Sequence, residues 1–253
     1  DKEDEEQAMS TAGKNDVYYC GDEDDGHAKK NKWLKTWLPQ DTNEEEDDQK
    51  WFWFDKNGEL FRTSTGSDAI KYKLDEGKLV VDGSARGVAK KKVNSKDYWF
   101  TKDGVMLSKF YQVGNDMYYF GGSDDGSMKT GSQSIKDNTG DTYKFYFYTK
   151  AQYDHKKGAG VIGNQSNKLY YYGLLLTADD YKYQVATIKD EKDSNKEYSF
   201  IINSNGSIQH SYGTTYKEDG DELIVVDEST KTLKKDNTYG TAKYVEDGQY
   251  KYG

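Results

Sequence analysis

The sequence predicts an all-β protein, an elongated solenoid of stacked β-hairpin repeats. Three observations lead to this fold class: aromatic residues make up 15% of the 253 residues, 25 glycines and one proline supply turns, and one stretch of the chain occurs twice. Large rings bury roughly 150 to 250 Å² each, so they can form a core where aliphatic residues are few. No window longer than about ten residues has helical periodicity.

The repeated stretch is the strongest of these observations. Residues Asn15–Lys30 (NDVYYCGDEDDGHAKK) align without gaps on Asn115–Thr130 (NDMYYFGGSDDGSMKT), at an offset of 100, and nine of sixteen positions are identical. Internal similarity of this kind is typical of stacked supersecondary units. We therefore expect the chain to fold as a series of similar units.

Weaker copies of an aromatic strand, a polar turn and a second short strand recur along the chain. The aromatic copies are Trp51–Thr63, Tyr98–Phe110, Phe145–Gly160, Leu169–Gln184 and Tyr198–Gly213, and two copies with Val and Ile in place of rings are Lys78–Lys91 and Glu222–Lys235. Each copy predicts a β-hairpin, because turns such as DKNG (55–58) and TKDG (101–104) supply a residue that accepts positive φ. Since one hairpin is only marginally stable, each is expected to bury its rings against the next.

The charge pattern predicts the organisation of the chain. Residues 1–14 have no apolar periodicity and are expected to form a disordered acidic arm. Residues 15–40 are predicted to be the first repeat unit, residues 41–48 (DTNEEEDD) an exposed acidic loop, and residues 49–253 the hairpin array.

Composition excludes several classes of partner and cofactor. No run approaches the roughly 20 apolar residues of a membrane span, so membrane insertion is not expected. The net charge of −9 opposes binding driven by phosphate neutralisation, so nucleic acid is not an expected partner. The single Cys20 allows no internal disulfide, and the three histidines lack zinc-site spacing. The acidic stretch 22–26 (DEDDG) lacks the ligand spacing of a calcium loop. We expect no metal and no other cofactor.

The motif NDMYYFGGSDDGSMKTGSQ (Asn115–Gln133) resembles the cell-wall-binding or choline-binding repeat of Gram-positive surface and secreted proteins, which also occurs in glucan-binding domains and in toxin receptor-binding regions. The resemblance rests on the strand Tyr118–Phe120, the Asp/Gly turn after it, and the stretch Met128–Gly131. It implies a hairpin solenoid without catalysis that holds choline or a sugar against aromatic rings. It also implies an extracellular protein, either secreted or attached to the cell surface.

The sequence departs from this family at one informative position. The family's repeat ends with a Gly-Trp pair whose indole helps to form the ligand cage, whereas Gly131-Ser132 stands here. We therefore expect a polysaccharide, either a cell-wall polymer or an extracellular glucan, as the ligand, with choline as an alternative.

Aromatic side chains are the best candidates for contacting such a ligand, because a flat ring packs on the C–H face of a sugar or holds a cation. In the strand 51–54, two tryptophans share one face and two phenylalanines take the other. For every ring, packing in the core is the alternative role. The candidate ligand-binding residues are Trp33, Trp37, Trp51, Trp53, Trp99, Tyr118, Tyr119, Tyr146 and Tyr148.

These observations predict a non-catalytic carbohydrate-binding module that uses exposed aromatic residues. The alternative is a structural or protein-binding repeat array, such as an adhesin stalk or a toxin-like receptor-binding region, in which outward rings are few and scattered. A hydrolase would need two carboxylates that converge in a cleft. The sequence does not single out such a pair, so we expect no enzymatic activity.

Overall fold

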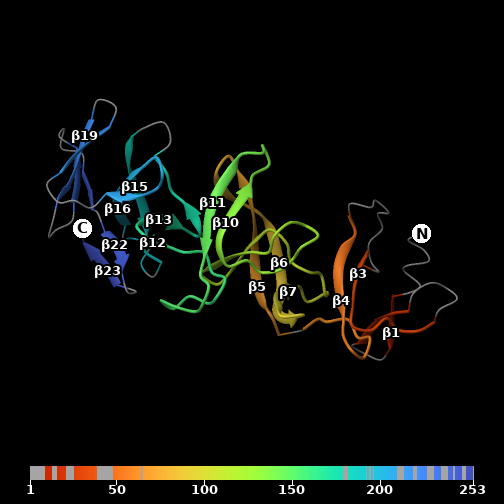
Figure 1. Ribbon diagram of the computed structural model, residues 1–253. Coiled ribbons are helices and arrows are strands. Elements are labelled where there is room, and N and C mark those ends of the chain that lie inside the picture. The colour runs from red at the N-terminus through yellow and green to blue at the C-terminus, as the bar shows by residue number, and fades with distance from the viewer. Residues whose placement is uncertain are drawn as a thin grey trace. The chain divides into compact units, whose positions relative to one another are not determined.

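The computed structural model of the chain contains β-strands and turns, and it has no α-helix among the residues that it describes (Figure 1). The structure describes residues 9–12, 16–20, 26–38, 48–63, 65–178, 182–191, 193, 195, 197–209, 214–218, 221–226, 231–234, 239–241, 243–246 and 249–252. The prediction of an all-β chain built from hairpins is confirmed. No helix long and apolar enough to span a membrane occurs in this part of the chain.

The strands form antiparallel sheets. In the first half of the chain the pairings are β1 (Met9–Ala12) with β2 (Asp16–Tyr19), β3 (Lys32–Thr36) with β4 (Lys50–Phe54), and the order β7 (Lys96–Phe100), β6 (Lys78–Val93), β5 (Ser67–Asp75), β8 (Phe110–Val113), β9 (Asp116–Tyr119). In the second half, one five-stranded sheet has the order β10 (Gly131–Lys136), β11 (Thr142–Phe147), β14 (Leu174–Leu175), β13 (Lys168–Tyr171), β12 (Gly163–Gln165). A three-stranded sheet follows, with the order β15 (Tyr183–Lys189), β16 (Glu197–Asn203), β17 (Ile208–Gln209). The last two sheets have the order β18 (Thr215–Glu218), β19 (Asp221–Val226), β20 (Lys231–Lys234), β21 (Tyr239–Thr241), and the pair β22 (Lys243–Glu246) with β23 (Gln249–Tyr252).

The chain divides into two compact units. Unit 1 consists of Asp1–Lys73, Val81–Val113 and Tyr119–Met128, and unit 2 of Leu74–Val80, Gly114–Tyr118 and Lys129–Gly253. Of the acidic arm predicted over 1–14, only Met9–Ala12 is described, and it forms β1. Of the acidic loop predicted over 41–48, only Asp48 is described. The predicted division into arm, first repeat, loop and array stays a prediction.

Four reversals in the described residues share one hydrogen-bonding pattern. Asp55, Thr101, Asp137 and Asn203 each accept, through a side-chain oxygen, the backbone N–H groups of the residues two and four positions later, at 2.8–3.3 Å. The residue three positions later is in each case a glycine with positive φ: Gly58, Gly104, Gly140 and Gly206. Glycine adopts this conformation without steric cost, and the polar side chain satisfies the turn's backbone. The turns predicted at 55–58 and 101–104 are confirmed.

Backbone hydrogen bonds join one hairpin to the next. In unit 1 the N–H of Leu60 donates to the carbonyl oxygen of Val17 at 2.7 Å. In unit 2 the N–H of Gly160 donates to the carbonyl oxygen of Met117 at the same distance. The two pairs are separated by 100 residues at both ends, which is the offset of the repeated stretch. The sequence repeat therefore corresponds to a repeated backbone contact.

Strand β4 is buried on both of its faces. Phe52 and Phe54 belong to a cluster with Val17 on one face, whereas Trp53 packs with Phe100 on the other. The predicted alternation of rings along this strand is thus confirmed. No outward platform of paired indoles results from it, because a strand with packed neighbours on both sides contributes to a core on both faces.

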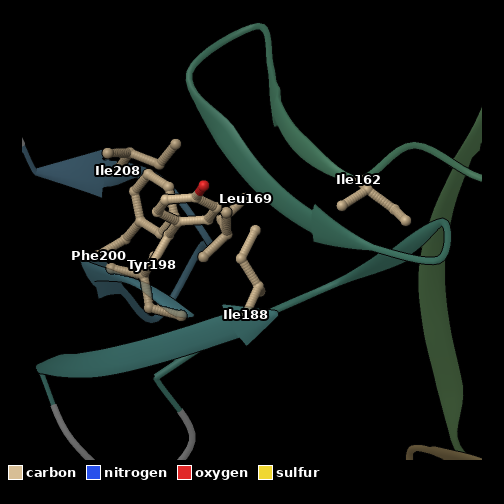
Figure 2. Packing of buried hydrophobic residues seen from close by; sticks show 7 residues of the cluster. Ile162, Leu169, Ile188, Tyr198, Phe200 and Ile208 are labelled. Atoms are coloured by element: carbon tan, nitrogen blue, oxygen red, sulfur yellow. The ribbon is translucent and has the colours of Figure 1, made fainter. Parts of the chain in front are cut away.

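The core of unit 2 is formed by apolar side chains from several hairpins. Figure 2 shows Leu169 of β13, Ile188 of β15, Phe200 of β16 and Ile208 of β17 converging on one another. All four are buried. Burial of a side chain of this size contributes about 1.5 to 3 kcal/mol, so this cluster stabilises the stacked arrangement that the ring-rich sequence predicts.

The copy predicted over 78–91 is not a hairpin. Strand β6 continues through 82–87 (DGSARG), and the reversal lies earlier, at Glu76 and Gly77, which have positive φ. The backbone of β6 is approached closely at Gly87: a Cβ atom on Gly66 would lie 2.3 Å from the carbonyl group of Gly87, and a Cβ atom on Gly87 would lie 2.9 Å from Cβ of Lys102. Glycine inside a strand can mark a close backbone approach as well as a turn, and the sequence pattern alone does not distinguish the two.

Candidate functional site

A cavity of about 480 Å³ opens in unit 1, lined by aromatic, thioether and charged side chains. The residues that define its chemistry are Trp51, Met106, Tyr111, four lysines (Lys35, Lys50, Lys71 and Lys109) and one carboxylate, Asp124. Cavities of this size are typical of small-ligand sites. We refer to it as the Trp51 cavity.

Two cross-strand pairs place a lysine beside a ring in this cavity. Lys35 of β3 is opposite Trp51 of β4, and Lys71 of β5 is opposite Tyr111 of β8. Directly opposed residues of antiparallel strands point to the same face of the sheet. The register of each strand pair therefore puts an ammonium group beside an aromatic ring, and all four side chains line the cavity.

Trp51 is half-buried, and its indole is held in place by Asp124. The indole N–H donates a 2.8 Å hydrogen bond to Oδ1 of Asp124, and Nζ of Lys35 lies 2.9 Å from the same oxygen. Lys35 Nζ is also 6.0 Å from the centre of the Trp51 ring. The hydrogen bond from Trp51, followed by that from Lys35, holds the pKa of Asp124 below its ordinary value, so this carboxyl group is ionised at neutral pH.

Met106 and Tyr111 form the apolar part of the wall. The N–H of Met106 donates to the carbonyl oxygen of Trp51 at 2.9 Å, and the Trp51 side chain packs against the cluster that contains Met106. Tyr111 is buried, and this burial, followed by the nearby charge of Asp82, raises the pKa of its phenol. A neutral phenol and a thioether beside an indole make a surface that accepts a flat, weakly polar ligand face.

The other predicted ligand residues of unit 1 lie outside the cavity. Trp33 is half-buried, with its ring centre 5.3 Å from that of the buried Trp53. Trp37 is half-buried. Trp99 is buried, with its ring 6.1 Å from that of Phe120, and Tyr119 is half-buried with its ring 4.6 Å from that of Phe110. A role of these four tryptophans and of Tyr119 in ligand binding stays a prediction.

The predicted ligand residues of unit 2 are also placed among other side chains. Tyr118 is buried and its hydroxyl donates to Asp116 at 3.1 Å. Tyr146 is half-buried, with its ring 6.0 Å from that of Tyr170. Tyr148 is buried and stacks on His155 at 5.4 Å. Contact of these tyrosines with a ligand stays a prediction.

A second group of charged residues lies in unit 2, and its members form ion pairs with one another. Nδ1 of His155 lies 2.7 Å from Asp116, and Nε2 lies 3.1 Å from Glu191. The hydrogen bonds to Asp116 and then to Glu191 raise the pKa of His155 to about 9, so the imidazole is protonated at neutral pH. Burial alone would raise the pKa of Asp116, but hydrogen bonds from the His155 side chain and the Lys156 N–H outweigh it and lower that pKa. We call these three side chains the His155 cluster.

Metal ligation has no candidate in the described part of the chain. No group of three or more His, Cys, Asp or Glu side chains there is placed to hold an ion. In the His155 cluster the two carboxylates lie on opposite ring nitrogens, so they neutralise the imidazolium from both sides. The acidic stretch 22–25 lies outside the described residues.

Sequence reasoning identified one ring of the Trp51 cavity and missed the rest. Its lysines come from β3, β4, β5 and the segment before β8, and no local motif connects them. Asp124 offered a signal, since it lies in the turn of the second repeat copy. Among the aromatic side chains whose burial the structure describes, Tyr153 has a large exposed fraction, 44%, and the predicted ligand residues are buried or half-buried.

No family model matches the chain, and no curated protein shows significant similarity to it. Solved structures similar to it include choline binding protein F from Streptococcus pneumoniae, at 19% identity over 92% of each chain, with a TM-score of 0.33. CbpJ from Streptococcus pneumoniae TIGR4 is 16% identical over 96% of this chain and 92% of that chain, with a TM-score of 0.32. Alternansucrase in complex with isomaltononaose is 16% identical over 87% of this chain and 14% of that chain, with a TM-score of 0.29. Because these TM-scores are low, the function has to rest on the site geometry.

Proposed function

We propose that the chain is a non-catalytic carbohydrate-binding module of a secreted or surface-attached protein, which holds a cell-wall polymer or an extracellular glucan at the Trp51 cavity. One observation carries the proposal: the half-buried indole of Trp51 is fixed by Asp124 at the wall of a cavity of about 480 Å³. A fixed ring loses little conformational entropy on binding, which favours recognition of a flexible ligand.

The chemistry of the wall fits a sugar. The indole face and Met106 offer apolar area for the C–H face of a pyranose, and Gln49, Ser108 and Ser123 offer polar groups at the same wall. A single site of this kind binds weakly. Several sites along one polymer would raise the apparent affinity through multivalency, which gives the remaining predicted rings a role in the same function.

The carboxylates support binding without catalysis. Glycoside hydrolysis ordinarily uses two carboxyl groups, about 5 to 9.5 Å apart, on either side of the bond that breaks. Asp124 accepts hydrogen bonds from both Trp51 and Lys35. Asp116 and Glu191 are each engaged with His155. These engagements leave none of the three carboxylates poised to donate a proton.

The test is binding of the purified chain to insoluble glucans and to isolated cell walls. Trp51→Ala should weaken apparent affinity about tenfold, because it removes the ring that contacts the sugar. Tyr72→Ala is the matched control, since Tyr72 is also a half-buried ring of unit 1 but neither lines the cavity nor belongs to the predicted ligand residues. Equal binding of the wild type and the Trp51 variant would reject the proposal, provided that circular dichroism shows both proteins to be folded. Release of reducing sugar by the wild type would reject its non-catalytic part.

A protein-binding array is the second candidate, and exposed aliphatic side chains favour it. Val81 is 60% exposed and Ile70 is 43% exposed, both in unit 1. Apolar side chains with this exposure on strands are typical of contact surfaces when they are contiguous. Absence of binding to every glycan and cell wall by the folded chain would favour this candidate over a carbohydrate-binding module.

A further inference from the structure

We propose that the Trp51 cavity selects anionic saccharides, which bear phosphate or carboxylate groups, over neutral saccharides and over choline. This inference rests on the proposed function and names the ligand class of the same site. The charge of the cavity wall is opposite in sign to that of the whole chain. The whole chain has a net charge of −9, whereas the cavity wall has four lysines and one carboxylate.

Two of the four lysines are not neutralised by the part of the chain that the structure describes. Lys35 is paired with Asp124 at 2.9 Å, and Lys71 with Asp82 at 3.4 Å. Lys50 and Lys109 line the same cavity and form no ion pair with a described residue. Ammonium groups that share a cavity repel one another, and an anionic ligand removes this repulsion. The net charge of the chain opposes polyanions at long range, but screening confines that effect to about 8 Å at physiological salt.

The backbone of Lys109 is the second observation. Its φ of 63° lies in the left-handed region, which disfavours side chains with a Cβ atom. The conformation is fixed from both sides, because its N–H donates to Gly121 O at 2.8 Å and its carbonyl oxygen accepts from the Phe120 N–H at 2.9 Å. Glycine or asparagine would be less strained there. A lysine kept in this conformation at a cavity wall points to a function of its side chain.

The ring of Trp51 argues against a quaternary ammonium ligand. The cation nearest to its face is the chain's own Lys35, 6.0 Å from the ring centre. A choline headgroup would have to displace this ammonium group and would also face Lys50 and Lys109. A sugar that stacks on the indole and directs a phosphate or carboxylate toward the lysines satisfies both parts of the wall.

The experiment is an NMR titration that follows the indole N–H signal of Trp51, assigned by its loss in Trp51→Phe. The probes are glucose 6-phosphate, glucuronic acid, glucose, choline and inorganic phosphate. We expect glucose 6-phosphate or glucuronic acid to bind at least about fivefold more tightly than glucose, and choline to bind more weakly than glucose. The phosphate and carboxylate arms distinguish the two sources of negative charge. Raising the salt concentration from about 50 to about 500 mM should abolish most of the preference.

Two variants test the lysines separately from folding. Lys50→Ala and Lys109→Gly should each weaken binding of the preferred anionic probe about threefold to tenfold, and should weaken glucose binding by a smaller factor. Lys109→Gly should also raise the melting temperature, because glycine relieves the left-handed strain. A more stable variant that has lost affinity cannot be explained by misfolding. Lys92→Ala, an exposed lysine of β6 outside the cavity, is the control and should behave as the wild type.

Equal affinity for glucose and both anionic sugars, or undiminished anion binding by Lys50→Ala and Lys109→Gly, would overturn this inference and leave the proposed function intact. Failure of every sugar to bind would overturn both. Binding of inorganic phosphate as tight as that of glucose 6-phosphate, with no effect of Trp51→Ala on either, would identify a simple anion site and would also overturn the inference.

Discussion

The Trp51 cavity and the His155 cluster combine the same kinds of side chain with opposite results. Each sets rings beside charged groups, but in the cluster both nitrogens of the imidazolium face carboxylates, at 2.7 and 3.1 Å. In the cavity, Lys50 and Lys109 have no described ionic partner. Satisfied charges hold a fold together, whereas unsatisfied charges at an open wall are available to a ligand. The comparison separates a stabilising site from a binding site within one repeat architecture.

The two units also differ in the length of one corresponding segment. In unit 1 the bridge between Phe54 and Leu60 encloses residues 55–59, which form a tight turn. In unit 2 the bridge between Phe147 and Gly160 encloses residues 148–159, and this longer segment carries His155. The bridges correspond, because Leu60 and Gly160 make the same backbone bond to the preceding hairpin. The longer segment of unit 2 therefore contains a side chain, that of His155, for which the shorter segment of unit 1 has no counterpart.

The largest effect is expected from His155→Ala. It leaves Asp116 and Glu191 without their shared cation, and loss of one partner from a largely buried ionic group costs about 3 kcal/mol. Urea unfolding followed by circular dichroism measures the change in the free energy of unfolding. Lys150→Ala, an exposed residue of the same segment, is the control and should be nearly neutral. A similar small change in both variants would show that the cluster is not stabilising.

The pH dependence of stability should have the sign that a protonated histidine dictates. Because the pKa of His155 is raised to about 9, its contribution is complete below its ordinary pKa of 6.5 and disappears as the pH rises through 9. The pKa of Asp116 is lowered, so its contribution is present above 3.8 and disappears as the pH falls through its lowered value. We expect a loss of about 2 kcal/mol between pH 6.5 and 10 in the wild type, measured by urea unfolding at each pH. His155→Gln should show no such loss; an equal loss in both would contradict the assignment.

A glycine behind the cavity provides a smaller perturbation. A Cβ atom on Gly126 would lie 2.1 Å from the sulfur of Met106, and Gly126 also has a positive φ. Gly126→Ala should therefore displace Met106, destabilise the chain by about 1 to 2 kcal/mol in urea unfolding, and weaken sugar binding. Gly122→Ala is the matched control, because a methyl group added there would have no neighbouring atom within 4 Å and its φ is ordinary. Equal stability of the two variants would mean that Met106 is not held where we describe it.

The smallest effect is expected from Asp124→Asn. The amide oxygen can still accept the indole N–H of Trp51, while the negative charge beside Lys35 is removed. Affinity for the anionic sugar should rise about twofold, and affinity for glucose should stay constant, as measured in the same titration. Asp103→Asn, at an exposed ion pair with Lys102 away from the cavity, should have no effect. A fall in anion affinity in the Asp124 variant would contradict the proposed direction of charge selection.

Much of the fold could be predicted from the sequence, because hairpins are encoded locally. The four-residue turns that begin at Asp55 and Thr101 contain both the side-chain acceptor and the glycine that the reversal needs. The strand alternation of Trp51 to Phe54 was also readable, since its period depends only on backbone geometry. The error at β6 had the converse cause: Gly83 and Gly87 look like turn residues, but both lie within one continuous strand, and Gly87 is packed against residues that are distant in the sequence.

The site was less predictable, because its parts are brought together by register. Whether Lys71 shares a wall with Tyr111 depends on the pairing of β5 with β8, which are separated by the whole of β6 and β7. A shift of one residue would direct Lys71 to the other face. Trp51 itself was predicted as a candidate, but no sequence signal distinguished it from Trp53, whose ring is enclosed by a second layer.

The bond between consecutive hairpins involves main-chain atoms alone, and this has an evolutionary consequence. Val17 and Leu60 in one pair are replaced by Met117 and Gly160 in the other, yet the donor, the acceptor and the 2.7 Å distance are unchanged. Selection can therefore let side chains diverge at these positions without undoing the junction. Duplicated segments of such a chain can drift until their common ancestry is hard to detect, while each still docks on its neighbour.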